Sequence, residues 1–163
     1  HISLRTLDEI LAKVLNWTEK IPVDLVSRDN KHEVLELRLL ETNVLMQYVR
    51  TSERLARHYC DSEPKRALTH FWNATETLEW LSKVEQVNQN EPLSKTVYTL
   101  AFNMYANLSH VLAKHLGDLD LARECDVAAL RFGNNLRLGA GLTESQQRTY
   151  AVLLAATGGN SKA

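Results

Sequence analysis

One residue whose type and position could do chemistry is His110, which lies near the end of a predicted helix. His110 shares the polar side of that helix with Asn103, Asn107 and Lys114, because side chains three, four and seven positions apart lie on one face. Histidine phosphotransfer needs an exposed imidazole with hydrogen-bonding and cationic neighbours, and Lys114, four positions on, could supply the cation. His110 and Lys114 are therefore the candidate catalytic residues of a phosphotransfer-like signalling module.

The segment ANLSH at positions 106–110 resembles the phospho-acceptor box of sensor histidine kinases. That resemblance implies a helical histidine that accepts a phosphoryl group. The box normally places an acidic residue directly after the histidine to polarise it, whereas this chain has Val111 there, and it continues with Lys114 and His115 where the box has a polar residue and a proline. We therefore expect His110 to be an ordinary solvent-facing residue and keep phosphotransfer as the alternative function.

The usual spacings of metal sites and enzyme motifs do not occur in the sequence. There is no His-x-x-x-His, Glu-x-x-His or Cys-x-x-Cys pair, and no phosphate-binding loop or nucleophile elbow. Cys60 and Cys125 are far apart and form no disulfide framework, which indicates a reducing compartment such as the cytoplasm. We expect no catalytic residue, metal or cofactor, and a metal site would have to assemble from residues distant in sequence.

The length favours one domain, residues 1–163. The overall charge gives no reason to expect nucleic acid or a membrane as a partner. The chain has 163 residues, 44% of them hydrophobic, and 19 basic against 20 acidic residues give a formal charge of −1. A balanced charge attracts neither nucleic acid nor an anionic membrane. No stretch approaches the roughly 18 consecutive apolar residues of a membrane span. We expect a cytoplasmic protein that binds neither.

The pattern of caps and breakers predicts an all-α fold. Capping boxes begin at Thr6 and Thr143, Pro64 and Pro92 suit first turns, and Gly117 suits a helix end. A loop is expected over 134–141. Short loops require long neighbouring helices to run antiparallel, so we predict an antiparallel multi-helix bundle of about six helices, three of them roughly 24–28 residues long. The expected helices span about 7–19, 30–60, 64–88, 92–117, 118–133 and 143–158.

Two groups of small and aromatic residues have the spacing seen in a tetratricopeptide hairpin: Ala67, Phe71 and Ala74, then Gly117, Ala122 and Ala129. The two units resemble the second helix of that repeat and its turn glycine with two small positions. Their first small positions, Ala67 and Ala122, lie 55 positions apart, whereas the repeat has about 34 residues. The resemblance implies packed helical hairpins and a peptide-binding class, and it transfers no site residue.

The predicted helix over 64–88 carries two apolar stripes. One contains Leu68, Phe71, Ala74, Leu78 and Leu81, and the other contains Trp72, Trp80, Val84 and Val87. One helix face cannot bury both sets, so either neighbours surround this helix or the second stripe is covered by a partner or a second copy of the chain. Because Trp anchors many interfaces, Trp72, Trp80 and Val84 are the candidate partner-binding residues.

A basic face is the second candidate for partner binding. Arg50, Arg54 and Arg57 recur at helical spacing, with Lys65 and Arg66 just past the following turn. Such a face can hold an acidic partner or a phosphate, or it can be a solvated face paired with nearby carboxylates. Together these features predict a non-enzymatic regulatory or adaptor domain that binds a protein or peptide and forms a homodimer if the apolar stripe binds its own copy.

Overall fold

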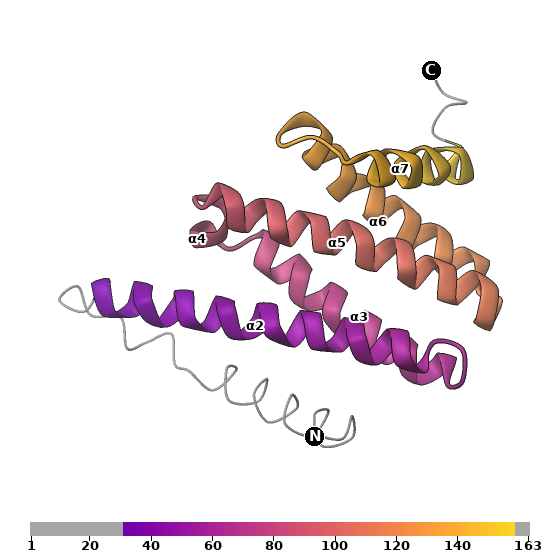
Figure 1. The fold of residues 1–163 in the computed structure, drawn as a ribbon, viewed down its shortest axis with the longest axis horizontal. Helices are drawn as coiled ribbons and strands as arrows, with labels where there is room; N and C mark the ends of the chain where they lie inside the picture. Colours follow the sequence, from indigo (N-terminus) through magenta and orange to yellow (C-terminus); the bar gives the residue numbers. More distant parts are fainter. Residues whose placement is uncertain (1–30, 159–163) are drawn as a thin grey trace. The chain divides into compact units, whose positions relative to one another are not determined.

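The computed structural model describes residues 31–158, and gives only the backbone for residues 31–41 and Gln86. Contacts divide the chain into two compact units, residues 1–51 and 52–163. The expected helix at 7–19 lies outside the described residues, and the single domain stays a prediction. Between residues 31 and 158 all regular structure is helical, which confirms the all-α fold class (Figure 1).

Helix α2 (Lys31–Tyr59) is the long uninterrupted helix that the sequence predicts between about 30 and 60. The boundary between the two units falls inside it, after Thr51. In the first unit, the side chains of Leu45, Met46 and Val49 are buried, as their spacing of about one helical turn requires for a single buried face. The described part of the first unit is therefore one amphipathic helix.

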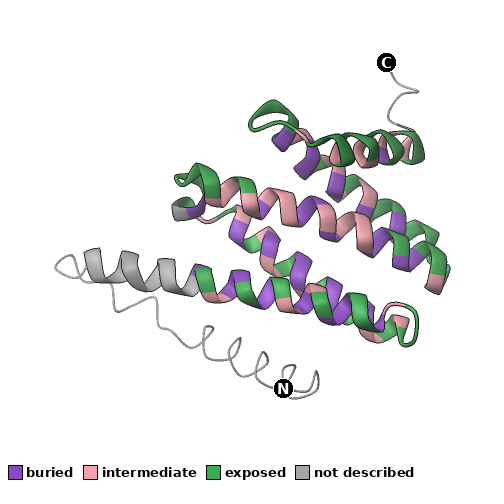
Figure 2. Ribbon diagram, in the orientation of Figure 1, coloured by how far each residue is buried: buried purple, intermediate pink, exposed green. Residues whose placement is uncertain are grey.

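The second unit is an antiparallel helical bundle. The last turns of α2 lead into α3 (Pro64–Ser82), a single turn α4 (Glu85–Asn88), α5 (Glu91–Val111), a π-helical segment η3 (Leu112–Leu116), α6 (Leu119–Leu138) and α7 (Glu144–Thr157). Helix α5 is central, since α3, α4 and α6 all pack against it, while α7 packs against α6. Burial agrees with this order: Val97, Ala101, Met104 and Leu108 of α5 are fully buried, and Figure 2 shows α5 as buried segments alternating with intermediate ones.

Most helix ends lie where the sequence predicts them, because local capping groups fix them. Asn90 accepts a hydrogen bond from the backbone amide of Leu93 at 3.2 Å, and Asp118 accepts one from Leu121 at 3.1 Å. Thr143 and Gln146 form the reciprocal capping box that starts α7. Gly117 adopts the left-handed φ of 67° after η3, a conformation that favours glycine.

Two predicted boundaries are wrong. The helix expected to run to Asn88 ends at Ser82, because Val84 takes an extended conformation and the chain turns so that Val87 is fully buried in α4. The loop expected from residue 134 is instead helical, since α6 continues to Leu138. Packing overrides the glycine signal there: Gly133 is buried where α6 meets Phe102 and Tyr150, and these contacts favour a continuous helix.

Candidate partner-binding site

Helix α3 buries one apolar stripe and leaves two tryptophans of the other at the surface. Phe71 and Leu78 are buried, whereas Trp72 is 40% exposed and Trp80 is 51% exposed. Val84, the third predicted partner residue, is half-buried beyond the end of α3. Trp72 and Trp80 are therefore not enclosed by neighbouring helices and lie at the surface.

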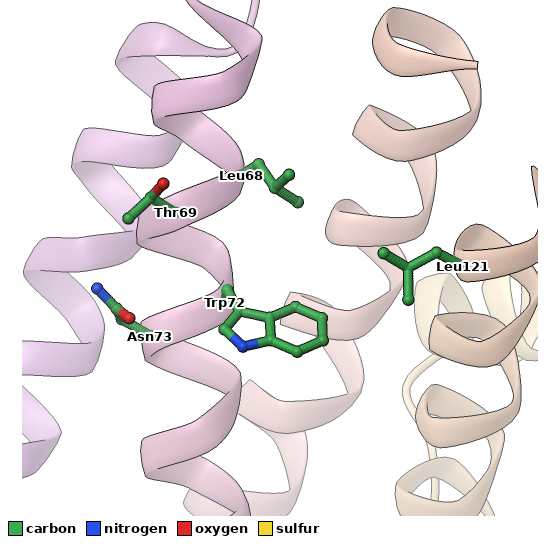
Figure 3. A pocket seen from close by; sticks show the side chains of 5 residues that line it. All are labelled: Leu68, Thr69, Trp72, Asn73 and Leu121. Carbon is green, nitrogen blue, oxygen red and sulfur yellow. The ribbon is translucent and has the colours of Figure 1, made fainter. Parts of the chain in front are cut away.

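A pocket opens beside Trp72, between α3 and α6. Its volume is about 340 Å³, and it is lined by Leu68, Thr69, Trp72, Asn73 and Leu121. The indole ring of Trp72 points across the gap toward Leu121, and Leu68 borders the same gap one turn earlier on α3 (Figure 3). Apolar side chains thus face one another across a cavity that lies within the size range of ligand pockets, roughly 300–1,000 Å³.

The Trp72 ring is held in place by a polar contact on its own helix. Its Nε1–H donates a hydrogen bond to Oε1 of Glu76 at 2.9 Å. Glu76 is exposed, as are Asp120 and Glu124, which flank Leu121 on α6. Residues one turn apart on a helix are neighbours, so Glu76 lies beside Trp72 and Glu124 beside Leu121, while Lys65 lies one turn before Leu68 and Thr69. The rim is mainly acidic.

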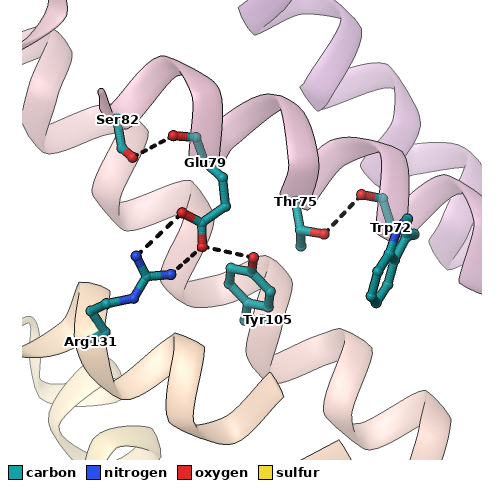
Figure 4. Close-up of polar contacts among 6 residues, drawn as sticks. All are labelled: Trp72, Thr75, Glu79, Ser82, Tyr105 and Arg131. Carbon is teal, nitrogen blue, oxygen red and sulfur yellow. Dashed lines mark hydrogen bonds and ion pairs between the residues drawn. The ribbon is translucent and has the colours of Figure 1, made fainter. Parts of the chain in front are cut away.

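A polar cluster joins α3, α5 and α6 further along the same helices. Glu79 on α3 accepts a hydrogen bond from the Tyr105 hydroxyl on α5, with 2.9 Å between Oε1 and the phenolic oxygen (Figure 4). Arg131 on α6 binds both carboxylate oxygens of Glu79, with 3.3 Å between Nη1 and Oε2. Glu79 follows Trp72 by two turns, so this cluster fixes the two pocket walls relative to α5.

Aromatic packing against Phe132 supports the cluster of Glu79, Tyr105 and Arg131. The guanidinium of Arg131 lies over the Phe132 ring, 4.7 Å from its centroid, and the Tyr105 ring stacks on Phe132 at 6.0 Å. Burial raises the pKa of Tyr105, and its hydrogen bond to Glu79 raises it further. The phenol therefore stays a neutral donor to Glu79, and the bridge between the three helices is kept.

The predicted arginine face is present as three exposed side chains on α2. Arg50, Arg54 and Arg57 are all exposed. Arg57 pairs with Glu53 on the same helix, with 2.6 Å between Nη2 and Oε1. Beyond the turn, Arg66 lies over the Tyr59 ring at 4.0 Å and so covers that ring. Docking of an acidic partner on this face stays a prediction.

Three of the histidines that the structure describes lie in different settings. His110 is exposed, as expected, and so is Lys114 within η3, which leaves phosphotransfer untested. His70 is buried and stacks on Tyr59, with 6.0 Å between ring centroids. His115 is largely covered and its Nε2 lies 3.6 Å from a carboxylate oxygen of Asp61.

Sequence reasoning missed Leu121, Glu79, Tyr105 and Arg131. The spacing of Trp72, Glu76 and Glu79 already places them along one side of α3, which was a usable signal. Nothing local in the sequence indicates that this side faces α6, because the pairing depends on how both helices pack on α5.

Comparison of the chain with protein-family models, curated proteins and solved structures finds no match. No helix among residues 31–158 is long and apolar enough to cross a membrane.

Proposed function

We propose that this chain is a non-enzymatic helical binding domain that takes a large apolar side chain of a protein or peptide partner into the α3–α6 pocket. The observation that carries this proposal is Trp72, a residue that is 40% exposed and whose ring forms a wall of the pocket. Large aromatic residues that remain partly exposed beside a cavity are typical of interface anchors.

The chemistry of the pocket defines the group that it would bind. Leu68, Trp72 and Leu121 supply apolar surface, while Thr69 and Asn73 supply polar groups at one edge. An aliphatic or aromatic side chain that fills this space removes its own apolar surface and that of the indole from water, which yields about 25 cal/mol for each Å² buried. A small polar metabolite would gain little from such walls.

The charged rim favours a partner with basic residues beside its apolar anchor. Glu76 and Glu124 each lie one turn from a pocket-lining residue. Complementary charge across an interface speeds encounter and fixes orientation. The expected partner segment is therefore an apolar anchor flanked by lysine or arginine.

The cluster of Glu79, Tyr105 and Arg131 supports binding by preorganising the site. It joins α3 and α6 through α5 before any partner arrives. A pocket whose walls are already positioned loses less conformational entropy on binding.

Selection from a random peptide library tests the proposal. We expect selected peptides to share a large apolar residue with nearby lysine or arginine. Trp72→Ala should weaken their binding by about 2 kcal/mol or more, roughly thirtyfold in Kd, measured by fluorescence anisotropy. Leu121→Trp should also weaken binding, because the larger ring fills the pocket while Trp72 stays in place.

Trp80→Ala is the matched control, since Trp80 is an exposed tryptophan on the same helix that does not line the pocket. We expect it to weaken binding much less than Trp72→Ala, with helicity by circular dichroism unchanged in all three variants. Equal binding by wild type and by folded Trp72→Ala and Leu121→Trp would contradict the pocket as the binding site.

A further inference from the structure

Three potential metal ligands that are separated in sequence lie together at one end of the second unit. They are the thiol of Cys60, the carboxylate of Asp61 and the imidazole of His115, and one ligand atom of each lies within 4.8 Å of the others. The spacing rules applied to the sequence could not find this group, because they search for ligands that are neighbours along the chain.

The fold brings these residues together through two fixed elements. Cys60 and Asp61 lie in the turn between α2 and α3, which is closed by a hydrogen bond from the Glu63 amide to the Tyr59 carbonyl at 2.8 Å. His115 lies in η3, which packs against α3 and α6. The chain then closes through a hydrogen bond from the Asp118 amide to the Leu112 carbonyl at 3.0 Å.

His115 lies within the π-helical turn of η3. A regular α-helix would place residue 115 almost in line with Leu108, seven positions earlier, on the fully buried face. The wider π turn changes this register, and π segments within helices occur frequently at functional sites. The imidazole consequently reaches the α2–α3 turn with its Nε2 3.6 Å from Asp61 Oδ1.

One of these distances is close to the ligand spacing of a tetrahedral metal site. Bond lengths of about 2.0–2.1 Å to nitrogen and oxygen and about 2.3 Å to sulfur place neighbouring tetrahedral ligands roughly 3.4–3.6 Å apart. The Asp61–His115 separation of 3.6 Å already matches. The remaining separations, within 4.8 Å, need a small rotation of the Asp61 or Cys60 side chain, and Asp61 is exposed in a turn where its side chain can rotate.

We propose that Cys60, Asp61 and His115 form a binding site for one Zn²⁺ ion, with a fourth position open to water. Thiolate, imidazole and carboxylate are all ligands of zinc, and a thiolate disfavours the hard cations Mg²⁺ and Ca²⁺. Binding releases the Cys60 thiol proton to solvent. The resulting thiolate and the Asp61 carboxylate together balance the charge of the ion.

The bound ion would join the α2–α3 turn to the end of the central helix. Cys60 and Asp61 follow α2 directly, and His115 follows α5 through η3. Zinc would therefore crosslink two parts of the second unit that are 55 residues apart, as counted from Cys60 to His115. This role is independent of the partner-binding pocket.

Cobalt substitution tests the site directly. The full chain, reduced and freed of metal with a chelator, is titrated with Co²⁺ and followed by absorption, and Zn²⁺ is then added in competition. We expect one equivalent of Co²⁺ to bind with a thiolate-to-metal charge-transfer band in the near ultraviolet, and Zn²⁺ to remove that band.

Matched variants identify the ligands. Cys60→Ser should abolish the charge-transfer band, whereas Cys125→Ser, which changes the other cysteine of the chain, should keep it. Loss of an outer-shell contact lowers metal affinity about 10–100-fold, and His115→Gln, which removes a ligand, should lower it by at least as much. His110→Gln should leave the metal affinity unchanged. Circular dichroism confirms that each variant is folded.

Three outcomes would overturn the proposal. The first is no charge-transfer band in the wild-type chain. The second is a band that survives Cys60→Ser, and the third is an affinity unchanged by His115→Gln. Asp61→Asn should also weaken affinity, and an unchanged value would contradict the three-ligand assignment.

Discussion

Both carboxylate oxygens of Glu79 on α3 bind the guanidinium of Arg131 on α6, across 52 residues of sequence. The same carboxylate accepts a hydrogen bond from the Tyr105 hydroxyl on α5. Three helices of the second unit therefore meet at one side chain. The cluster lies two turns from Trp72 along α3, so its integrity determines how the pocket walls are held.

The Glu79–Arg131 ion pair should stabilise the fold modestly. The Arg131 side chain is 53% exposed, so solvent screens the pair and we expect a coupling free energy of about 0.2–1 kcal/mol. A double-mutant cycle with Glu79→Gln and Arg131→Gln, measured by urea unfolding, gives this value. The Glu144–Arg148 pair within α7 is the control, since both of its side chains are more exposed. A coupling of zero for Glu79–Arg131 would contradict a bridging role.

Alkaline pH should destabilise the second unit through Tyr105. Burial and the Glu79 contact raise the pKa of the folded phenol above its unfolded value of about 10. A group whose pKa is raised by folding stabilises the protein below its unfolded pKa, and this stabilisation is lost as pH rises toward the folded value. The free energy of unfolding should therefore fall above about pH 10, and less steeply in Tyr105→Phe.

The buried thiol of Cys125 adds to that pH dependence. Burial raises its pKa to about 11, and the neighbouring carboxylates of Asp126 and Glu124 contribute. Its stabilising effect is likewise lost as pH rises from about 9 toward the folded value. Urea unfolding of Cys125→Ala across the same pH series separates the thiol's share. A pH profile that is identical in wild type, Tyr105→Phe and Cys125→Ala would contradict both assignments.

Gly133→Ala should destabilise the fold although it lies in a helix. A Cβ atom there would lie 2.8 Å from Tyr150 Cδ2 and 2.9 Å from Phe102 Cε2, and Phe102 is fully buried. Overpacking of this kind costs about 1–3 kcal/mol, which exceeds the gain of about 1 kcal/mol from replacing a helical glycine. Thermal unfolding should show a lower Tm. Asn135→Ala, an exposed position in the same helix, should instead leave Tm equal or higher.

Trp80→Lys should keep the fold and remove any self-association that covers this tryptophan. The side chain is 51% exposed, and exposed substitutions usually change stability by about 0.5 kcal/mol or less. Leu78→Lys, at a fully buried position, should unfold the chain and serves as the contrast. If a second copy covers Trp72, Trp80 and Val84, light scattering should show a dimer for wild type and a monomer for Trp80→Lys. Loss of helicity in Trp80→Lys would mean that this tryptophan is core.

Charge reversal on α2 tests the arginine face. Arg50→Glu with Arg54→Glu should change stability little, because both side chains are exposed. Arg57→Glu should cost slightly more, about 0.3–0.5 kcal/mol, since it breaks the pair with Glu53. An acidic peptide that docks on this face should lose most of its affinity after the double reversal and bind more weakly as salt rises. Binding that is insensitive to both would exclude the arginines.

The sequence by itself determined the helical class and most helix ends. Caps such as Asp118 and the Thr143–Gln146 box act on amides within three residues, so the local sequence contains all that is needed to locate them. The apolar period of α3 likewise indicated its buried stripe, whereas the second stripe left burial and a partner surface both open, and only the structure shows that Trp72 and Trp80 are exposed while Val87 is buried.

Only the tertiary structure decided which helix faces meet. Three features depend on contacts between elements that are separated in sequence. They are the packing around Gly133 in α6, the pairing of Glu79 with Arg131, and the approach of His115 to Cys60. Periodicity gives the direction of a side chain around its own helix, whereas its partner depends on how each helix packs on α5. The pocket and the metal-ligand group are products of that packing, which is why sequence spacing alone did not reveal them.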